Sequence, residues 1–357
     1  MQGKACDKPC DKQSHEQCDF KTNGMYYLRR QLKAEGIQRK TRNILCSAWR
    51  ENTKKTYNVY IRKWTIFCHI QGLNVVDPDV KHVLAFLTHL YEVEGLGYSS
   101  INIARSAISS LCCGKVKVGQ NHRISEFITA IANLRQVIPR NKVIWDTSLV
   151  LKFLEHWHPA KNLSLRQLSI KTVLLCLLVS GQRGQTIWLM DERNIVFEKE
   201  SVRCSITAPL KTSNPRHHIE ELCFKRYSIN KALCVYHYLK HYRQRTEPLR
   251  AKSDKNSVAG KGGRGSNYGF FLRTIPPHSP ICRGTLTSWT KEGLRLSGVD
   301  VSRFTPHSTR SASTSKAKRS IGLATILKTA GWRNATTFAR FYDKQIEKQG
   351  WGVEALI

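Results

Sequence analysis

Hydrophobic positions in residues 45–140 recur with the spacing of amphipathic helices. In "NTKKTYNVYIRKWTIFCHIQG", residues 52–72, one stripe is formed by Tyr57, Tyr60, Ile61, Trp64, Phe67 and Cys68. We expect Asn52 or Thr53 to cap this helix and Gly72 to end it. Three more helical patterns follow in "DPDVKHVLAFLTHLYEVEG", "SSINIARSAISSLCCG" and "RISEFITAIANLRQV". No strand-like segment interrupts them, so 45–140 is predicted to be an all-helical module.

The spacing of hydrophobic residues changes in the second half of the chain. A basic, turn-rich linker at 139–148 precedes two predicted helices, 147–157 and 164–181. The alternating segments "NIVFEKE", "SVRCSITAPL" and "RHHIEELCF" then predict three short antiparallel strands. A helix at 229–245 and a Gly/Lys/Ser-rich loop at 250–269 follow, and the chain is predicted to be helical again from about 281.

These patterns predict a mainly α protein with a small antiparallel β-sheet. With 357 residues the chain is long enough for two domains. We place a helical domain at 45–140 and an α+β domain at 147–350. Residues 1–44 are expected to form a polar, flexible leader, and residues 351–357 a short C-terminal tail.

The charge balance points to an anionic partner. The chain has 58 Lys and Arg against 26 Asp and Glu, a formal net charge of +32. Nucleic acid is the first candidate and an acidic membrane surface the second. The longest apolar run, "TVLLCLLVSG", is well short of the roughly 18 residues that span a bilayer. The first residues also lack the apolar segment of a secretory signal, so we favour nucleic acid and expect no membrane association.

The twelve cysteines do not indicate a disulfide scaffold, because the chain is neither small nor visibly secreted. Cys46, Cys68, Cys176 and Cys234 lie in apolar helical contexts, where a free thiol behaves as a small hydrophobe. We therefore expect a reducing compartment.

One cysteine cluster is different. In "CDKPCDKQSHEQC" the spacing C-x3-C-x4-H-x2-C joins Cys6, Cys10, His15 and Cys18. Three thiolates and an imidazole can hold zinc tetrahedrally. A disordered polar leader fits the same residues, so both interpretations stay open.

Arg183 and Lys211 are the first two candidates for chemistry. Arg183 follows a strongly apolar helix in "SGQRGQTIWLM", where an arginine is ordinarily a solvated partner of the helix dipole. Lys211, in "LKTSN", falls at the predicted turn between the second and third strands, where an ordinary hairpin lysine is the simplest interpretation.

The next candidates lie near the end of the sequence. In "HSTR", His307 and Arg310 are one helical turn apart and share a face. "GWRNATTFARFYDK" carries Trp332 and Tyr342. Tyr342 also shares a helical face with Phe338 and Phe341, at positions i+4, i and i+3, so core packing is the competing interpretation.

Taken together, these residue types suit metal-free transfer of a DNA strand. A phosphodiester under attack gains negative charge, which the bidentate fork of an arginine matches. A tyrosine phenol can act as nucleophile and store the bond energy as a phosphotyrosine. A histidine can accept the phenol proton and a lysine can protonate the leaving oxygen. Two arginines supply the electrostatic stabilisation, so no metal or other cofactor is needed for the reaction.

Four segments resemble the motif boxes of tyrosine recombinases, the phage-integrase superfamily: "SGQRGQTI", "PLKTSN", "TPHSTR" and "AGWRNATTFARFY". Their detailed form is most similar to recombinases of DIRS-type and Crypton-like eukaryotic elements. The resemblance covers about 45–350. It implies a helical, SAM-like core-binding domain followed by an α+β catalytic domain, and recombination or integration of a mobile element.

The resemblance also implies roles for individual residues. Arg183 and Arg310 would clamp the phosphate, and Lys211 would be the general acid. His307 would accept a proton, Trp332 would replace a histidine beside the scissile phosphate, and Tyr342 would be the nucleophile. An indole N–H can still donate one hydrogen bond to that phosphate.

Two features depart from the family pattern. Thr186 stands where members often have an acidic residue. The interval from Trp332 to Tyr342 is ten, one longer than is common in bacterial members, which puts Phe341 at the usual spacing. Phenylalanine has no hydroxyl, so only Tyr342 qualifies as nucleophile.

The implied partners are double-stranded DNA, gripped between the two domains, and further copies of the chain in a synaptic tetramer. Residues expected to face DNA are Arg62, Lys63, Arg105, Lys316, Lys318 and Arg319. The eukaryotic resemblance implies a nuclear location. A domesticated, non-catalytic DNA-binding protein and a topoisomerase-like nickase are the alternative functions.

Overall fold

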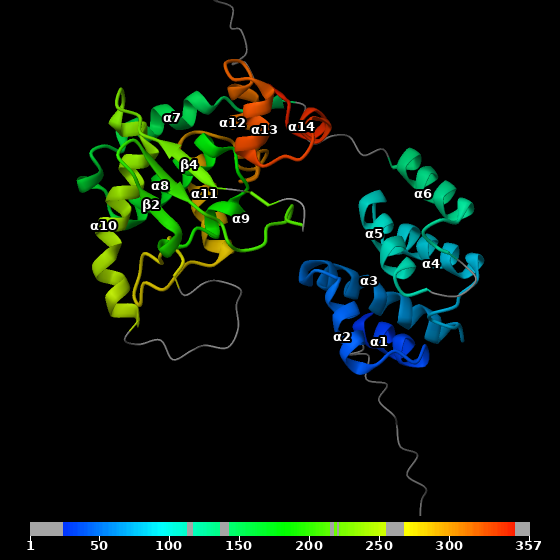
Figure 1. The fold of residues 1–357 in the computed structure, drawn as a ribbon. Helices are drawn as coiled ribbons and strands as arrows, with labels where there is room; N and C mark the ends of the chain where they lie inside the picture. Colours follow the sequence, from blue (N-terminus) through cyan, green and yellow to red (C-terminus); the bar gives the residue numbers. More distant parts are fainter. Residues whose placement is uncertain are drawn as a thin grey trace, which may run out of the picture. The chain divides into compact units, whose positions relative to one another are not determined.

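The computed structural model describes residues 24–112, 117–135, 143–214, 218–219, 221–254 and 268–346. The possible zinc ligands Cys6, Cys10, His15 and Cys18, and the tail at 351–357, lie outside these residues. The chain divides into two compact units, residues 1–139 (unit 1) and 140–357 (unit 2), drawn in Figure 1.

Unit 1 is helical throughout its described part. Its helices are α1 (Gly24–Ala34), α2 (Arg39–Ser47), α3 (Glu51–Ile70), α4 (Val80–Glu92), α5 (Tyr98–Ser109) and α6 (His122–Leu134). The predicted stripe of α3 is largely confirmed, because Ile61, Trp64 and Cys68 are completely buried in the core that α3 shares with α4, α5 and α6.

The predicted cap of α3 is wrong. The helix starts one residue before Asn52, with Arg50 in the capping position and no side-chain capping bond. Asn52 and Thr53 therefore lie inside the first turn. Glu51 occupies the first position, where its negative charge favours the helix N-terminus and pairs with Lys54 at 3.0 Å.

The expected flexible leader is also partly wrong. Within residues 1–44 the chain is helical over α1, and α2 begins at Arg39. The two helices enclose a small cluster of Met25, Leu32 and Cys46. The Gly24 amide donates to Asn58 Oδ1 of α3 at 2.9 Å. The sequence does not predict α1 and α2 because they have few apolar positions and many charges. Their few apolar side chains are buried only by packing against each other and against α3.

Unit 2 combines helices with two small sheets. Its longer elements are α7 (Thr147–His156), α8 (Leu165–Ser180), α9 (Gly184–Trp188), α10 (Val235–Asp254), α11 (Arg283–Leu296), α12 (Ser308–Ala317), α13 (Leu323–Ala330) and α14 (Ala335–Phe341). Its strands are β1 (Val143–Ile144), β2 (Ile195–Phe197), β3 (Ser201–Cys204), β4 (Leu222–Lys225) and β5 (Gln345–Ile346).

Helix α8 is the centre of unit 2. It contacts α9, α10, α11, α12 and β4, and nearly all of its residues from Leu168 onward are buried. Its sequence is hydrophobic on all sides, as a buried helix requires. Ser164 and Gln167 form a capping box at its start, and Gly181 ends it in the left-handed conformation at φ 59°.

The predicted three-stranded antiparallel sheet is confirmed, in the order β2-β3-β4. Lys211 lies between β3 and β4, as predicted. A second pairing was not predicted: β1 and β5, which are far apart in sequence, pair in parallel through Val143 with Gln345 and Ile144 with Ile346. Strand β5 begins three residues after Tyr342, so this pairing anchors the segment that follows the candidate nucleophile.

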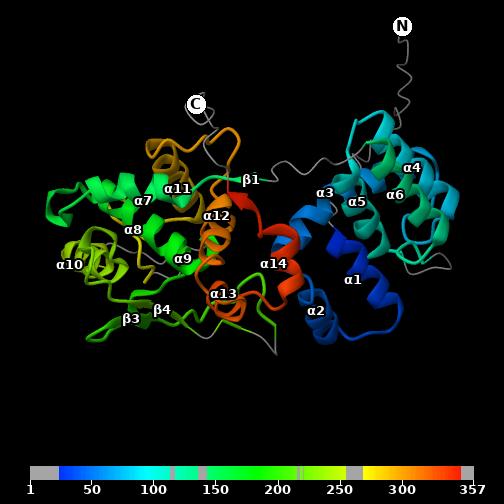
Figure 2. The same cartoon turned by 90° about the horizontal axis from the view of Figure 1, so that it is seen from above.

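Helices α12, α13 and α14 lie beside one another at one edge of unit 2, and α10 lies at the opposite edge (Figures 1 and 2). Helix α12 is buried although its sequence, "STRSASTSKA", is polar. Its small side chains allow close approach to α8, and their hydroxyls find acceptors. Ser313 donates to the Leu178 carbonyl, and Thr314 to the Arg310 carbonyl at 2.7 Å.

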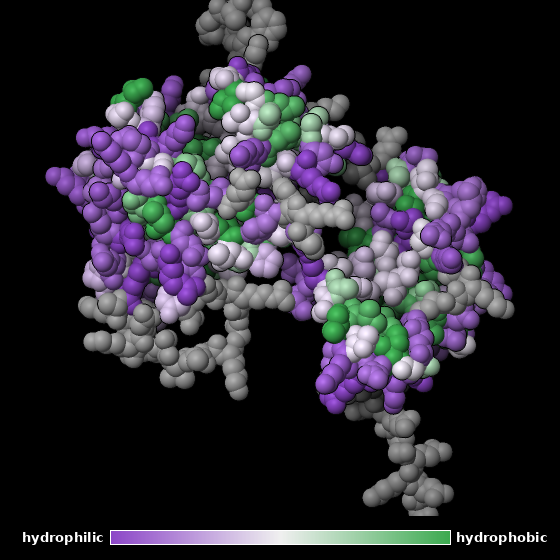
Figure 3. Space-filling view, viewed as in Figure 1, coloured by the Kyte–Doolittle hydropathy of each residue, from purple (hydrophilic) through white to green (hydrophobic). Residues whose placement is uncertain are grey.

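Hydrophilic residues cover most of the face shown in Figure 3, interrupted by small hydrophobic patches. In the part of the chain that the structure describes, no helix is both long and apolar enough to cross a bilayer. The four cysteines placed in apolar contexts, Cys46, Cys68, Cys176 and Cys234, are buried free thiols, as predicted.

Candidate active site

Arg310 is the most deeply buried charged residue of the predicted constellation, with 0% of its surface exposed. Its Nη1 donates to the carbonyl oxygens of Gly181 at 2.7 Å and Ala330 at 2.8 Å. These carbonyls belong to the ends of α8 and α13, so the guanidinium joins three helices. A Cβ on Gly181 would meet Thr314 Cγ2 at 2.7 Å, which explains the glycine at this close approach.

The other guanidinium donors of Arg310 are not used. Among the described residues, neither Nε nor Nη2 has a hydrogen-bond partner, although both atoms are buried. The indole Nε1 of Trp332 is likewise buried and unpartnered. The guanidinium carbon lies 3.8 Å from the centre of the Trp332 ring. A buried donor without an acceptor costs about 1–3 kcal/mol, so three of them in one place favour an acceptor supplied by a ligand.

The electrostatic environment of Arg310 is positive. Burial, and then the charge of Arg183, lower the pKa of Arg310 to about 9, and Tyr342 acts in the opposite direction. The guanidinium therefore remains charged at neutral pH. Since nearby positive charge disfavours this ion, a negatively charged ligand would relieve the repulsion.

His307 and Tyr342 meet directly. His307 occupies the position just before α12 and makes no side-chain capping bond there. Its Nε2 instead lies 3.2 Å from the Tyr342 hydroxyl, within hydrogen-bonding distance. Tyr342 also contacts the other members of the site: its ring centre is 4.8 Å from that of Trp332 and 5.3 Å from the Arg310 guanidinium carbon. The structure thus brings together four of the six predicted residues through direct contacts.

The backbone of Tyr342 is held from two directions. Helix α14 ends at Phe341, and the Tyr342 amide donates to the Phe338 carbonyl at 2.8 Å. The Tyr342 carbonyl accepts a hydrogen bond from Ser315 Oγ of α12 at 2.7 Å. These contacts fix the phenol against α12, on which Arg310 also lies.

The alternative of a shared core face at Phe338, Phe341 and Tyr342 is only partly correct. Phe338 is buried, but Phe341 is 55% exposed. The helix ends between Phe341 and Tyr342, so regular helical spacing no longer sets the direction of the tyrosine. Tyr342 packs partly into the cluster of Phe338 and Trp332, and its hydroxyl reaches His307.

The surroundings of His307 favour its neutral form. Removal of part of its ring from water, and then the charges of Arg310, Arg183, Lys211 and Arg283, lower its pKa below the usual value. A neutral imidazole at pH 7 can accept a proton from the phenol. The positive charges of Arg183 and Lys211 thus act on His307.

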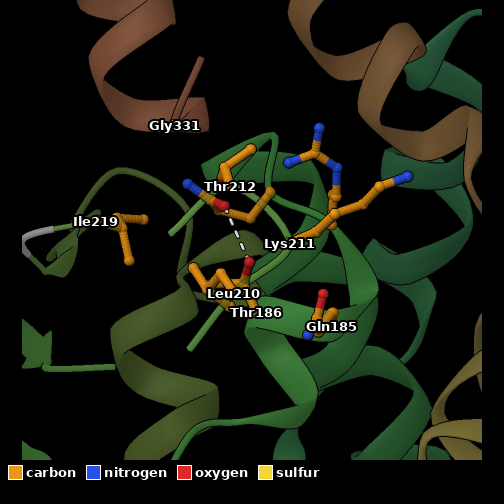
Figure 4. A pocket seen from close by; sticks show the side chains of 9 residues that line it. Gln185, Thr186, Leu210, Lys211, Thr212, Ile219 and Gly331 are labelled. Atoms are coloured by element: carbon orange, nitrogen blue, oxygen red, sulfur yellow. Dashed lines mark hydrogen bonds between the residues drawn. The ribbon is translucent and has the colours of Figure 1, made fainter. Parts of the chain in front are cut away.

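Arg183 and Lys211 line one small pocket with residues from the start of α9 and the end of α13. Figure 4 shows Lys211 and Thr212 on the loop after β3, with Gly331 opposite them. Arg183 immediately precedes α9 and is half-buried, whereas Lys211 is exposed. These two residues are therefore placed beside the Arg310 site by elements distant in sequence.

Gln182 is a residue of this site that sequence reasoning missed. It is only 3% exposed, and its Nε2 donates to the Thr329 carbonyl at 2.6 Å. Its Oε1 accepts from Thr186 Oγ1 at 3.1 Å, the dashed line of Figure 4. Gln182 thereby connects the turn that carries Arg183 with the end of α13 that leads to Trp332. Its position beside Arg183 in "GQRGQT" is the only signal in the sequence.

The residues predicted to face DNA differ in their surroundings. Three of them form ion pairs: Lys63 with Glu94, Lys316 with Asp146 at 3.1 Å, and Lys318 with Asp343 at 2.5 Å. The pairs of Lys316 and Lys318 tie α12 to the segments around Asp146 and Tyr342. The other three, Arg62, Arg105 and Arg319, form no ion pair with any residue that the structure describes. Arg62 and Arg319 are exposed, and Arg105 is half-buried.

No group of three or more His, Cys, Asp or Glu side chains that could hold a metal occurs among the described residues. The predicted zinc ligands Cys6, Cys10, His15 and Cys18 are not among them. Zinc binding by the N-terminal cluster therefore stays a prediction.

The sequence matches no protein-family model and no curated protein. The fold, in contrast, matches solved structures. A lambda integrase dimer bound to a COC′ core site has a TM-score of 0.52 and 16% identity, covering 92% of this chain and 98% of that one. The Tn1549 transposon integrase in complex with transposon right-end DNA has a TM-score of 0.52 and 12% identity, covering 94% and 97%.

XerH, a site-specific recombinase bound to a palindromic difH substrate, also has a TM-score of 0.52, at 11% identity, covering 80% of this chain and 74% of that chain. Sequence identities this low establish similarity of fold only. The chain therefore has the two-domain, mainly helical fold of the tyrosine recombinases.

Proposed function

We propose that this protein is a site-specific DNA recombinase or integrase that cuts and rejoins duplex DNA through a covalent 3′-phosphotyrosine. The observation that carries the proposal is the grouping of unpartnered donors on Arg310 and Trp332 beside the Tyr342 hydroxyl, which contacts His307. The fold of DNA-bound recombinases supports it.

In the proposed cleavage step, the Tyr342 oxygen attacks the phosphorus of a DNA phosphodiester. A bond forms between Tyr342 and phosphorus, and the bond from phosphorus to the 5′-oxygen breaks. The phenol proton moves to His307, and the leaving 5′-oxygen takes a proton from Lys211. Religation reverses these transfers with a different 5′-hydroxyl. No oxidant, reductant or external energy source is needed.

Arg310 would bind the non-bridging oxygens of the phosphate with Nε and Nη2, and Trp332 would donate its indole N–H to the same group. Arg183 would complete the positive site from the start of α9. Because the Arg310 guanidinium is already held by two carbonyls and stacked on Trp332, it needs little reorganisation when charge develops on the phosphate.

Integration of a mobile element, a synaptic tetramer and a nuclear location form the finer part of the proposal, and the motif resemblance supports them. A non-catalytic DNA-binding protein would use the same basic surface. The presence of Tyr342, His307 and both arginines favours catalysis over that alternative.

The proposal is tested with a nicked suicide duplex carrying the terminal sequences of the DNA element that encodes this chain. Wild-type protein should form a covalent complex visible on a denaturing gel. Tyr342→Phe should bind the same duplex with nearly unchanged affinity, because an isosteric change perturbs folding little, but should form no covalent complex. Phe341 offers a matched control: in the Tyr342→Phe background, Phe341→Tyr should not restore the complex, since Phe341 is exposed.

Three outcomes contradict the proposal. A covalent band that persists in Tyr342→Phe would assign the nucleophile to another residue. Restoration by Phe341→Tyr would mean that the site does not have the described geometry. Tight binding by the wild type without a covalent complex would support the non-catalytic alternative.

A further inference from the structure

The hairpin of α1 and α2, residues 24–47, carries a concentration of positive charge that the rest of unit 1 does not share. Six basic residues stand against a single acid, Glu35, which accepts a hydrogen bond from Gln31 at 2.9 Å. Five of the six are exposed and Arg42 is half-buried. The basic residues are Arg29, Arg30, Lys33, Arg39, Lys40 and Arg42.

This hairpin is a fixed part of unit 1. Its cluster of Met25, Leu32 and Cys46 packs against Trp49, which also meets the Tyr57 ring of α3 edge-on at 5.5 Å. A side chain at position 24 would collide with Ile61 of α3, so Gly24 permits the close contact. The charges are therefore displayed on a packed surface rather than on a loose tail.

Cations elsewhere in unit 1 are frequently neutralised by neighbours. From α3 to α6, Lys54 pairs with Glu51, Lys63 with Glu94, Lys81 with Asp79, and Arg123 with Glu126. In the described part of the chain, none of the six hairpin cations has an ion-pair partner. Their charge contributes no ion pair to the fold and adds mutual repulsion.

The placement of charge in α2 is also unfavourable for the helix itself. Arg39, Lys40 and Arg42 occupy its first turn, where the helix dipole favours acidic residues. The preceding residue, Gln38, provides no side-chain cap. Basic residues at such positions weaken the isolated helix, which is consistent with a role in binding rather than in folding.

We propose that the α1–α2 hairpin is a DNA-contacting surface whose cations bind the phosphates of duplex DNA, adding to the contacts of the α3–α6 module. The inference rests on the proposed function, because it assumes that duplex DNA is the ligand. Charge complementarity selects this occupant: exposed, unpaired cations match a phosphate backbone, and their contacts position the protein without reading sequence.

The test measures how the dissociation constant for a fluorescent duplex of mixed sequence depends on salt. The full chain is compared with Arg29→Gln/Arg30→Gln/Lys33→Gln, which keeps good helix-forming residues in α1. Each lost phosphate contact should reduce the slope of log affinity against log salt by about 0.9, so three should reduce it by about 2 to 3. Arg39→Gln/Lys40→Gln should also weaken binding while maintaining or raising the melting temperature.

A matched control removes three exposed lysines on α10 or on the short segments next to it: Lys161→Gln/Lys231→Gln/Lys240→Gln. Lys161 lies in a turn that contacts α10, Lys231 just precedes α10, and Lys240 lies on it. Helix α10 is at the edge of unit 2 opposite α12–α14. The control should keep the wild-type slope. Covalent complex formation at saturating DNA should be unchanged in the hairpin variants, since Tyr342 and its partners lie in unit 2.

The outcomes separate the two proposals. If the wild-type protein does not bind duplex DNA, or forms no covalent complex with it, the proposed function itself is refuted. Wild-type activity with an unchanged salt slope in the hairpin variants would refute only the hairpin inference. An unchanged salt slope together with altered self-association would show that the hairpin is a protein interface and would refute the inference. An equal reduction of the slope in the lysine control would show that the effect comes from total charge and would refute it as well.

Discussion

In the described part of unit 2 two basic side chains are completely buried, Arg310 and Lys171, and they differ in how their donors are used. Lys171 lies in α8, and its Nζ donates to the carbonyls of Leu154 at 2.5 Å and Trp157 at 2.6 Å. It also lies 4.0 Å from the centre of the Tyr238 ring. Arg310 likewise donates to two carbonyls, but its Nε and Nη2 have no partner in the described structure.

The difference separates a structural cation from a candidate catalytic one. The partners of Lys171 are the carbonyls at the end of α7, so its amino group caps that helix and its hydrogen bonds are completed within the protein. Arg310 uses only its Nη1 donors within the described structure. Its Nε and Nη2, which have no acceptor there, share a site with Trp332, Tyr342 and His307. Burial alone thus says little about function, whereas unsatisfied buried donors point to a missing acceptor.

The largest expected effect is on DNA cleavage by Arg310 variants. Arg310→Ala should slow covalent complex formation by about a hundred- to a thousandfold, the usual loss for one preorganised electrostatic contact. Arg310→Lys should be similarly impaired, because a lysine keeps the charge but not the planar fork. Lys171→Met should retain the wild-type rate per folded molecule. Rates are followed on the suicide duplex, with melting curves to verify folding.

Comparable losses in the Lys171 and Arg310 variants would remove the distinction between the two cations. Undiminished cleavage by Arg310→Lys would show that charge alone suffices and that the unpartnered donors have no role.

Removing the connection made by Gln182 should have a smaller effect. Gln182→Ala breaks its bonds to Thr329 and Thr186, and a loss of about 1.4 kcal/mol in transition-state positioning corresponds to roughly tenfold in rate. Gln182→Glu should be worse than Ala when it is ionised, since a buried carboxylate would lie against the Thr329 carbonyl oxygen, which repels it. A positioning role predicts a lower maximal rate at saturating DNA with little change in affinity, whereas equal losses in both would indicate general destabilisation.

The pH dependence of cleavage should identify His307. Its pKa is lowered by partial burial and by neighbouring cations, so it is neutral at pH 7 and becomes protonated only in acid. Single-turnover cleavage should therefore be flat near neutrality and fall only in acid, at a lower pH than an ordinary imidazole would give, as the proton acceptor is lost. His307→Ala should be slower by a modest factor and lose this acid limb. An unchanged limb in that variant would assign the titration to another group.

The smallest effect concerns the pH dependence of stability, and it tests the Lys171 side of the comparison. Burial lowers the pKa of Lys171 to about 7, against an ordinary value of 10.5. Between these values the unfolded chain binds more protons, so this lysine makes stability rise with pH across that range. The free energy of unfolding of the wild type, relative to that of Lys171→Met, should therefore grow from about pH 7 to pH 9. At the higher pH the wild type should be more stable by about 1–3 kcal/mol, because the variant leaves the two carbonyls without a donor. A pH-independent difference in melting temperature would show that the amine does not titrate in this range.

Much of the fold follows from local patterns in the sequence. The alternation at 194–224 predicted the β2-β3-β4 sheet, and the apolar run at 164–181 predicted the helix α8, which the structure buries. Patterns of this kind persist because each element buries its own apolar face.

The elements that were missed depend on partners far away in the chain. Helices α1 and α2 bury few residues and require α3, while β1 and β5 consist of two residues each and exist through their mutual pairing. Helix α12 looks solvent-exposed in sequence because it is rich in serine and threonine, yet those small residues are what allow it to approach α8.

The candidate site shows the same division. Motif order identified Arg310, His307, Trp332 and Tyr342, which the structure brings into contact. Sequence could not reveal that Arg310 keeps unpartnered donors, or that Gln182 bonds to a carbonyl 147 positions away. Both properties are created by the packing of α8, α12 and α13.

The most direct test of the central claim is a crystal structure of Tyr342→Phe bound to an uncleaved duplex. We predict that a non-bridging oxygen of the scissile phosphate lies within about 3.2 Å of Arg310 Nε or Nη2, and that Trp332 Nε1 donates to the same phosphate. Lys171 should keep its bonds to the carbonyls of Leu154 and Trp157. A phosphate bound elsewhere, with the Arg310 and Trp332 donors still unpartnered, would contradict the account.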